Sequence, residues 1–138
     1  MTPVKRWFAM FAMLIAGTPL IGRESAPADA APVRPAEAIR RIGQSEIVVE
    51  MVVKAAKDRL SKRGVIYLDS EADFQHSDNL GVAISAGAAT KLRQDGISDP
   101  AAHFLGKTIR VRGCVMRFEE RPYLPVLDPK QIDIVAGK

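Results

Sequence analysis

Residues 106–127 contain the feature that most restricts what this chain can fold into: a long alternating strand, a tight turn and a second strand. Side chains alternate between apolar and polar along the first strand, as expected where one face packs on a core and the other meets solvent. Gly113 interrupts the alternation, and a glycine within a strand is typical of a bulge or a barrel corner. Glu119 and Glu120 supply the turn. The pattern predicts a small closed barrel rather than an enzyme cleft.

The same alternation predicts which side chains form the core. Ile109, Val111 and Val115 share one face of the first strand, while Arg110 and Arg112 lie on the other. We expect the first three to be buried, together with Ile66, Leu68 and alternate residues from Ile47 to Val53. The two arginines are interpreted as a charged face that protects a sheet edge rather than as phosphate ligands.

The first 30 residues have the composition of a secretory leader. A basic pair precedes an apolar run over residues 7–21, and a region of small residues ends at Ala30. We expect cleavage near Ala30, with a cut after Ala28 as the alternative. A retained membrane anchor is the other interpretation, but residues 17–19 interrupt a run already shorter than the roughly 20 residues that a spanning helix needs. We therefore expect a secreted or periplasmic protein without a membrane span after cleavage.

Residues 31–138 are enough for one domain with a modest core, and we expect a monomer. They contain 17 Lys and Arg and 14 Asp and Glu, so the excess of three positive charges is too small to indicate a polyanion partner by itself. Cys114 is the only cysteine, which excludes an intramolecular disulfide. An apolar or ordinary thiol role is favoured for it over redox chemistry, because no second cysteine or nearby histidine accompanies it.

The order of predicted elements defines one domain over residues 45–135, preceded by a flexible linker. The linker, residues 31–44, is rich in Ala, Pro and Arg and lacks strand or strong helical periodicity. The predicted elements that follow are a strand over 45–55, a basic turn over 57–64, a strand over 65–69, a polar loop over 71–79 and a strand over 80–84.

Helix signals follow the third strand. Ser85 can cap a helix over residues 86–94, and Gly96 is placed to end it. Asp99-Pro100 then opens a short helical turn, since Pro is favourable at a first helical position. The strand–hairpin–strand region comes next, and residues 131–135 form a last extended piece after Asp128-Pro129.

Three strands, a helix and two strands is the order of the five-stranded Greek-key OB-fold barrel, in which the helix lies between strands three and four. The end of the chain resembles exported bacterial OB-fold domains of the nucleic-acid-binding, tRNA-anticodon and helicase type. The resemblance rests on residues 106–113, on Arg121-Pro122-Tyr123 and on residues 128–132, and it covers about residues 45–135. These motifs mark a barrel and a hairpin. They imply an all-β fold with one inserted helix, and a nucleic-acid ligand only by association.

OB barrels bind single strands on the face around strands two and three and the loops joining strands one to two and four to five, with cations for phosphates and aromatics for bases. The residues of this chain that match those places are Lys62, Arg63, Tyr67, Arg117, Arg121 and Tyr123. We expect a non-catalytic protein that binds single-stranded nucleic acid or another polyanion. An envelope protein that binds a protein or small ligand through the barrel face is the alternative, because charged turns are also ordinary solvated strand ends.

A hydrolase resembling staphylococcal nuclease is a third, less favoured interpretation. Arg63 precedes an acidic stretch over residues 69–73, superficially like the calcium-binding cluster of that family. Arg63 stands six residues before Asp69 where the family has five, so strand alternation should turn one of them to the other face. His76 and His103 lack ligand-spaced companions, and there is no phosphate-binding Gly-rich loop. No metal, no cofactor and no enzymatic activity is expected.

Overall fold

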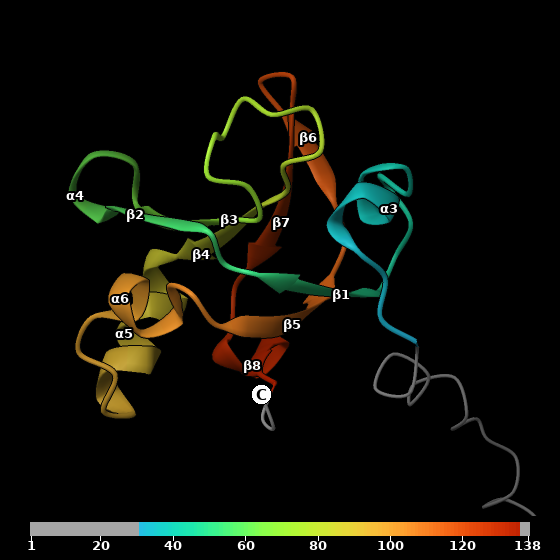
Figure 1. The fold of residues 1–138 in the computed structure, drawn as a ribbon. Coiled ribbons are helices and arrows are strands. Elements are labelled where there is room, and N and C mark those ends of the chain that lie inside the picture. Colours follow the sequence, from blue (N-terminus) through green and yellow to red (C-terminus); the bar gives the residue numbers. More distant parts are fainter. Residues whose placement is uncertain (1–30, 136–138) are drawn as a thin grey trace, which may run out of the picture. The chain divides into compact units, whose positions relative to one another are not determined.

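The computed structural model describes residues 31–135, so the predicted leader lies outside the described residues. The described chain is rich in short strands, with helices between them (Figure 1). The strands are β1 (Ile47–Val52), β2 (Ala55–Arg59), β3 (Val65–Asp69), β4 (Gly81–Ser85), β5 (Thr108–Gly113), β6 (Met116–Phe118), β7 (Arg121–Val126) and β8 (Ile132–Ile134). The helices are α3 (Pro35–Ile39), α4 (Leu60–Arg63), α5 (Ala86–Gln94) and α6 (Pro100–Phe104), and η1 (Pro129–Gln131) is a 3-10 turn.

The strands pair into two sheets. One sheet has the order β1-β5-β8 and the other β2-β3-β4-β7-β6; β4 and β7 run parallel, and every other pair in the described residues is antiparallel. The sheets share chain segments, because β1 leads into β2 and β5 leads into β6. At the first junction the Val53 amide donates to Lys107 O while the Lys54 amide donates to Asp69 O, so consecutive residues serve different sheets.

The fold confirms a largely β protein with a helix inserted after β4, but not the single closed five-stranded ring that we predicted. The pairings give two sheets because both long strands are interrupted, at residues 53–54 and 114–115. The predicted inserted helix is α5, and the short helical turn predicted after Asp99-Pro100 is α6; α3, α4 and η1 are additional short helical elements.

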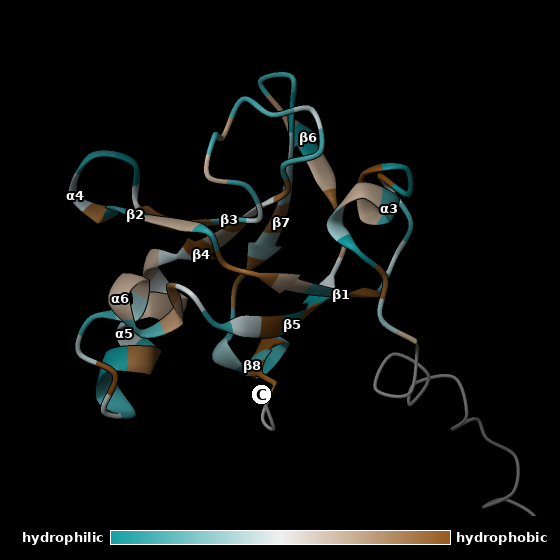
Figure 2. Cartoon of the chain, in the orientation of Figure 1, coloured by the Kyte–Doolittle hydropathy of each residue, from teal (hydrophilic) through white to brown (hydrophobic). Residues whose placement is uncertain are grey.

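The core lies between the sheets and contains every side chain predicted for it. Ile66, Leu68, Ile109, Val111 and Val115 are fully buried, and the alternate residues from Ile47 to Val53 are at most 4% exposed. Figure 2 shows brown, hydrophobic stretches within the strands and teal, hydrophilic loops beside α4 and at the tip of the β6–β7 hairpin. Helix α5 packs Ala88, Ala89 and Leu92 into the same core.

Local helix signals were predicted correctly. The Ala88 amide donates to Ser85 Oγ at 3.1 Å, which caps α5, and Gly96 follows that helix with a φ of +99°. The Ala102 amide donates to Asp99 Oδ1 at 3.2 Å at the start of α6. Gly113 is required for space: an added Cβ would stand 2.9 Å from Leu124 Cδ2. None of the helices in residues 31–135 combines the length and the apolar character that crossing a membrane requires.

Residues 31–44 are not the loose linker that we predicted. Val33 forms a parallel bridge with Val49, with the Val33 amide donating to Val48 O and the Glu50 amide donating to Val33 O, both at 2.9 Å. Helix α3 follows, begins at Pro35 and buries Ala38 completely. The segment orders because the outer edge of β1 offers unpaired backbone groups, which is a tertiary cause without local periodicity.

Two further expectations were wrong in detail. Residues 57–59 belong to β2 instead of the predicted turn, because β2 pairs along its whole length with β3, and the turn is reduced to α4 with Gly64 at a φ of +73°. Arg110 and Arg112 do not protect a sheet edge, because β5 lies between β1 and β8.

Candidate nucleic-acid interface

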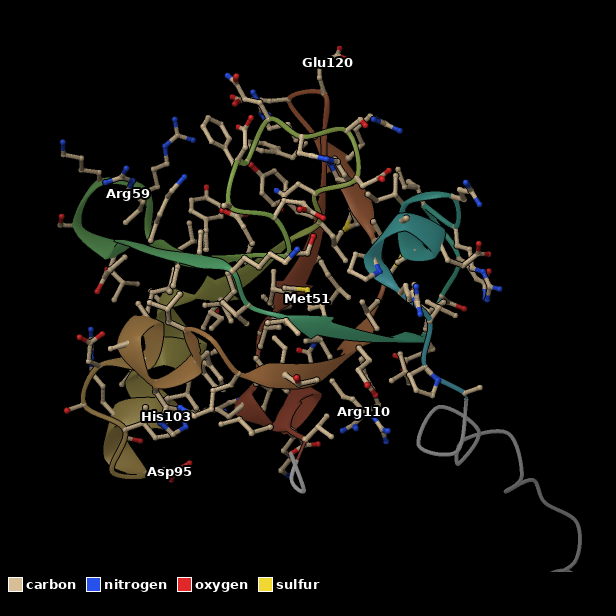
Figure 3. All side chains as sticks on the ribbon, in the orientation of Figure 1. Met51, Arg59, Asp95, His103, Arg110 and Glu120 are labelled. Carbon is tan, nitrogen blue, oxygen red and sulfur yellow. The ribbon has the colours of Figure 1, made fainter. Side chains whose placement is uncertain are left out.

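A hollow of about 540 Å³ opens at the end of the molecule that carries the β6–β7 hairpin and the loop between β3 and β4. Figure 1 shows that loop beside the hairpin, and Figure 3 shows Glu120 at the hairpin tip and Arg59 beside α4. We call this the cationic hollow. Its lining includes five basic side chains and three acidic ones: Lys57, Arg59, Arg63, Arg117, Arg121, Asp69, Glu119 and Glu120.

Five of the six predicted site residues line this one hollow. Arg63, Tyr67, Arg117, Arg121 and Tyr123 come from α4, β3, β6 and β7, and the fold brings them together. The sixth, Lys62, does not line it. It lies on the exposed α4 turn, one residue before Arg63, and adjacent residues of a helical turn point in different directions.

Three further residues of the same chemistry line the hollow and lie outside the predicted site set. Lys57 and Arg59 lie two apart on β2, where both can face the hollow, and Lys57 is the register partner of Tyr67. Both belong to the segment predicted as a basic turn, and the sequence placed them near the first loop without showing that they face this hollow. Phe74 lies in the loop after β3, and the sequence there carries no periodic signal.

Phe74 anchors the loop between β3 and β4, because two cationic side chains lie over its ring. Lys57 Nζ lies 4.3 Å and Arg121 Cζ lies 4.7 Å from the centre of the Phe74 ring. Arg121 Nη1 also donates a hydrogen bond to Phe74 O at 3.3 Å. The loop is therefore attached both to β2 and to the hairpin strand β7, which closes one side of the cationic hollow.

Tyr67 and Tyr123 form one wall. Their ring centres are 5.6 Å apart with an interplanar angle of 42°. The Tyr123 ring also lies against the backbone of β4, because a Cβ on Gly81 would come within 2.8 Å of it. Burial raises the pKa of the Tyr123 hydroxyl, Tyr67 adds to the rise and Arg121 opposes it. Tyr123 therefore stays a neutral donor at physiological pH.

Asp69 lines the hollow and is 3% exposed. Asn79 Nδ2 donates to its Oδ1 at 3.2 Å, and Lys57 Nζ stands 4.0 Å from its Oδ2. Burial raises the pKa of the Asp69 carboxyl, and Asn79 and Lys57 partly offset that rise. Asn79 also accepts from the Glu71 amide at 2.8 Å, so the buried amide side chain ties both ends of the loop together.

One feature of the structure agrees with the nuclease interpretation, and another disagrees with it. Arg63 and Asp69 line the same hollow, contrary to the strand-alternation argument, because Arg63 belongs to the α4 turn and not to β3. Asp69, however, is engaged by Asn79 and Lys57. Within residues 31–135, no three His, Cys, Asp or Glu side chains gather as a group that could hold a metal ion.

A second hollow, of about 500 Å³, adjoins the first, and we call it the apolar hollow. Four residues line both: Arg63, Tyr67, Arg117 and Tyr123. Its remaining lining is mostly apolar and consists of Val65, Ala83, Met116, Phe118 and Pro125. Phe118 and Tyr123 have ring centres 6.5 Å apart. A charged hollow and an apolar one thus meet along one aromatic wall.

Comparison with known proteins supports the fold and leaves the function open. No family model and no curated protein sequence matches the chain. Among solved structures, a protein described as an aspartyl-tRNA synthetase from Leishmania major Friedlin matches 97% of this chain with a TM-score of 0.50 and 10% sequence identity. The chain covers 26% of the length of that protein. At this identity the likeness concerns the fold alone.

Proposed function

We propose that this protein is a non-catalytic OB-fold binding protein that takes single-stranded nucleic acid, or another extended polyanion, in the cationic hollow. The observation that carries the proposal is the convergence of five predicted cationic and tyrosine side chains, with Lys57 and Arg59, on one surface. Cations that meet phosphates and aromatic rings that meet bases are the combination that single-strand binding uses.

The strand connectivity supports an OB-type arrangement. If β1 with β2 and β5 with β6 are each taken as one interrupted strand, the pairing runs β2-β3-β4-β7-β6 and returns through β5 to β1. In that description five long strands would follow the order of the OB fold, with α5 between the third and the fourth. The likeness to a protein described as a tRNA synthetase agrees with a nucleic-acid ligand.

Charge availability also supports the proposal. Within residues 31–135, Arg59, Arg63 and Arg117 take part in no salt bridge. Cations without an acidic partner can replace the counterions of a phosphate chain without first breaking an ion pair. An anion can therefore bind these arginines in the cationic hollow without the free-energy cost of breaking an ion pair.

A salt titration tests the proposal. We expect a fluorescent single-stranded oligonucleotide to bind the purified protein at low ionic strength, and we expect the affinity to fall steeply as salt rises, since phosphate contacts release counterions. A protein partner gripping an apolar surface would bind almost independently of salt. Absence of any salt-dependent retention of the oligonucleotide would rule out the nucleic-acid proposal in favour of the protein-partner alternative.

We further propose that the protein is exported and that residues 1–30 are removed. The support is the leader pattern of the sequence: a basic pair, an apolar run and a region of small residues that ends at Ala30. N-terminal sequencing or intact mass of the protein from an envelope fraction should find a chain that begins near Ala31. Recovery of a chain that still begins at Met1 in a membrane pellet would overturn this proposal.

A further inference from the structure

The two adjoining hollows suit a ligand that carries an anionic group beside an apolar group. The cationic hollow suits an anion, whereas the apolar hollow presents side chains such as Met116 and Phe118, both more than half exposed. A uniform polyanion would leave these apolar side chains uncovered. A nucleotide unit has a charged phosphate next to a flat base, which complements both surfaces at once.

The aromatic rings differ in how free they are to stack. Tyr67 and Tyr123 lie 5.6 Å apart, a spacing at which two rings already contact each other, and Tyr123 also covers the backbone at Gly81. Phe74 already carries two cations over its ring. Phe118 is 58% exposed and lies on β6, the outermost strand of the five-stranded sheet. Its ring therefore has the surface that a base needs.

We propose that the apolar hollow is a nucleobase site in which Phe118 is the stacking residue, with Met116 beside it. Arg63 and Arg117, which line both hollows, hold the adjoining phosphate. This inference rests on the proposed function and makes it narrower: the ligand is a single strand that carries bases, not a polyanion in general. It also shifts the stacking role from the two tyrosines predicted from sequence to a residue outside that set.

Two fluorescent probes of equal length and charge separate the ligand classes: an oligothymidylate and a phosphodiester of the same length that lacks all bases. We expect the parent protein to bind the oligothymidylate at least about tenfold more tightly, because base stacking adds to shared phosphate contacts. Phe118→Ala should weaken oligothymidylate binding by about 5- to 150-fold and leave the abasic probe unaffected. The salt slope should be the same for parent and variant.

Matched variants separate stacking from apolar contact. Phe118→Tyr should retain the parent affinity, whereas Phe118→Leu, which keeps apolar surface without a ring, should behave like Phe118→Ala. Leu127→Ala removes another exposed apolar side chain that lines neither hollow, and it should change nothing.

The possible failures have distinct meanings. Equal affinity of the parent for both probes would overturn the base site and leave the polyanion proposal in place. If Phe118→Ala bound neither probe, the base site would also be overturned, because the ring would then be needed for the structure of the hairpin and not for stacking on a base. Failure of the parent to bind either probe would instead remove the proposed function itself.

Discussion

Arginines on the two sheets of this protein meet different neighbours across the strands. On the β1-β5-β8 sheet, Arg110 lies opposite Glu50, and its Nε stands 2.8 Å from a Glu50 carboxylate oxygen. Arg112 reaches Asp133 on β8 at 3.9 Å. On the other sheet, the register partners of the cations in the hollow are Tyr67, Val65, Pro122 and Phe118, and none is acidic. Figure 3 shows Arg110 well away from the hairpin tip that carries Glu120.

The difference shows that the side chains on neighbouring strands, and not residue type, decide which arginines are held in ion pairs. Arg110, Arg112, Arg117 and Arg121 are alike in sequence, and each follows an alternating strand pattern. Acids on neighbouring strands neutralise Arg110 and Arg112 locally, whereas Arg117 and Arg121 have no such acid and keep their positive charge available to an external anion, Arg121 while it lies over the Phe74 ring. We call the surface of the β1-β5-β8 sheet that carries Arg110 and Arg112 the paired face. We expect polyanions to bind in the cationic hollow and not on the paired face.

The largest expected effect is on stability, and it compares a buried valine of β5 with an arginine of the paired face. Val111→Ala should lower the free energy of unfolding by about 1–3 kcal/mol through lost burial and a residual cavity. Arg110→Ala, one residue away on β5, should lower it by about 0.5 kcal/mol or less, because its ion pair is solvent-exposed. Denaturant melts of both variants check this. Equal midpoint shifts would mean that the face assignments of β5 are wrong.

The next prediction concerns polyanion affinity. Arg121→Ala should weaken oligonucleotide binding at low salt and reduce the salt slope by about one, as expected for the loss of one phosphate contact. Arg110→Ala is the matched control on the paired face and should leave affinity and slope as they are. Binding isotherms at several salt concentrations measure both quantities. Equal losses for the two variants would abolish the distinction between the faces.

A third prediction uses the pH dependence of Asp69. Its folded-state pKa is raised by burial, so the folded protein binds this proton more tightly than the unfolded chain does. The resulting stabilisation is fully present below the ordinary pKa of 3.8 and is lost as pH rises through the raised value. Asp69→Asn should therefore gain stability relative to the parent between acid and neutral pH. Urea melts across that range provide the measurement, and a constant difference would contradict it.

The smallest expected effect is that of Lys62→Ala. Lys62 lines neither hollow, so its removal should change the salt slope by much less than one unit. Arg63→Ala, at the neighbouring position, should reduce the slope by about one. Titrations of the two variants side by side test whether α4 directs these adjacent cations differently; similar slopes would show that it does not.

Local chemistry accounts for the parts of the fold that sequence predicted well. The cap residues Ser85 and Asp99, the turn at Glu119-Glu120 and the alternation along β5 each act within a few residues. The pairing of Val33 with Val49 and the extension of β2 to Arg59 depend on strand edges supplied by distant segments. Phe74 joined the site through cations from β2 and β7, and no local pattern could indicate that contact.

The partner exchange at Val53 and Lys54 has a consequence for how the protein unfolds. Because consecutive amides of one chain segment bond to Lys107 and to Asp69, neither sheet can detach without straining the other at this point. The two sheets should therefore lose amide protection together in a single cooperative transition. Native-state hydrogen exchange would then find the amides of β1 and β3 opening with the same free energy, so that the hollow keeps its shape until the whole domain unfolds.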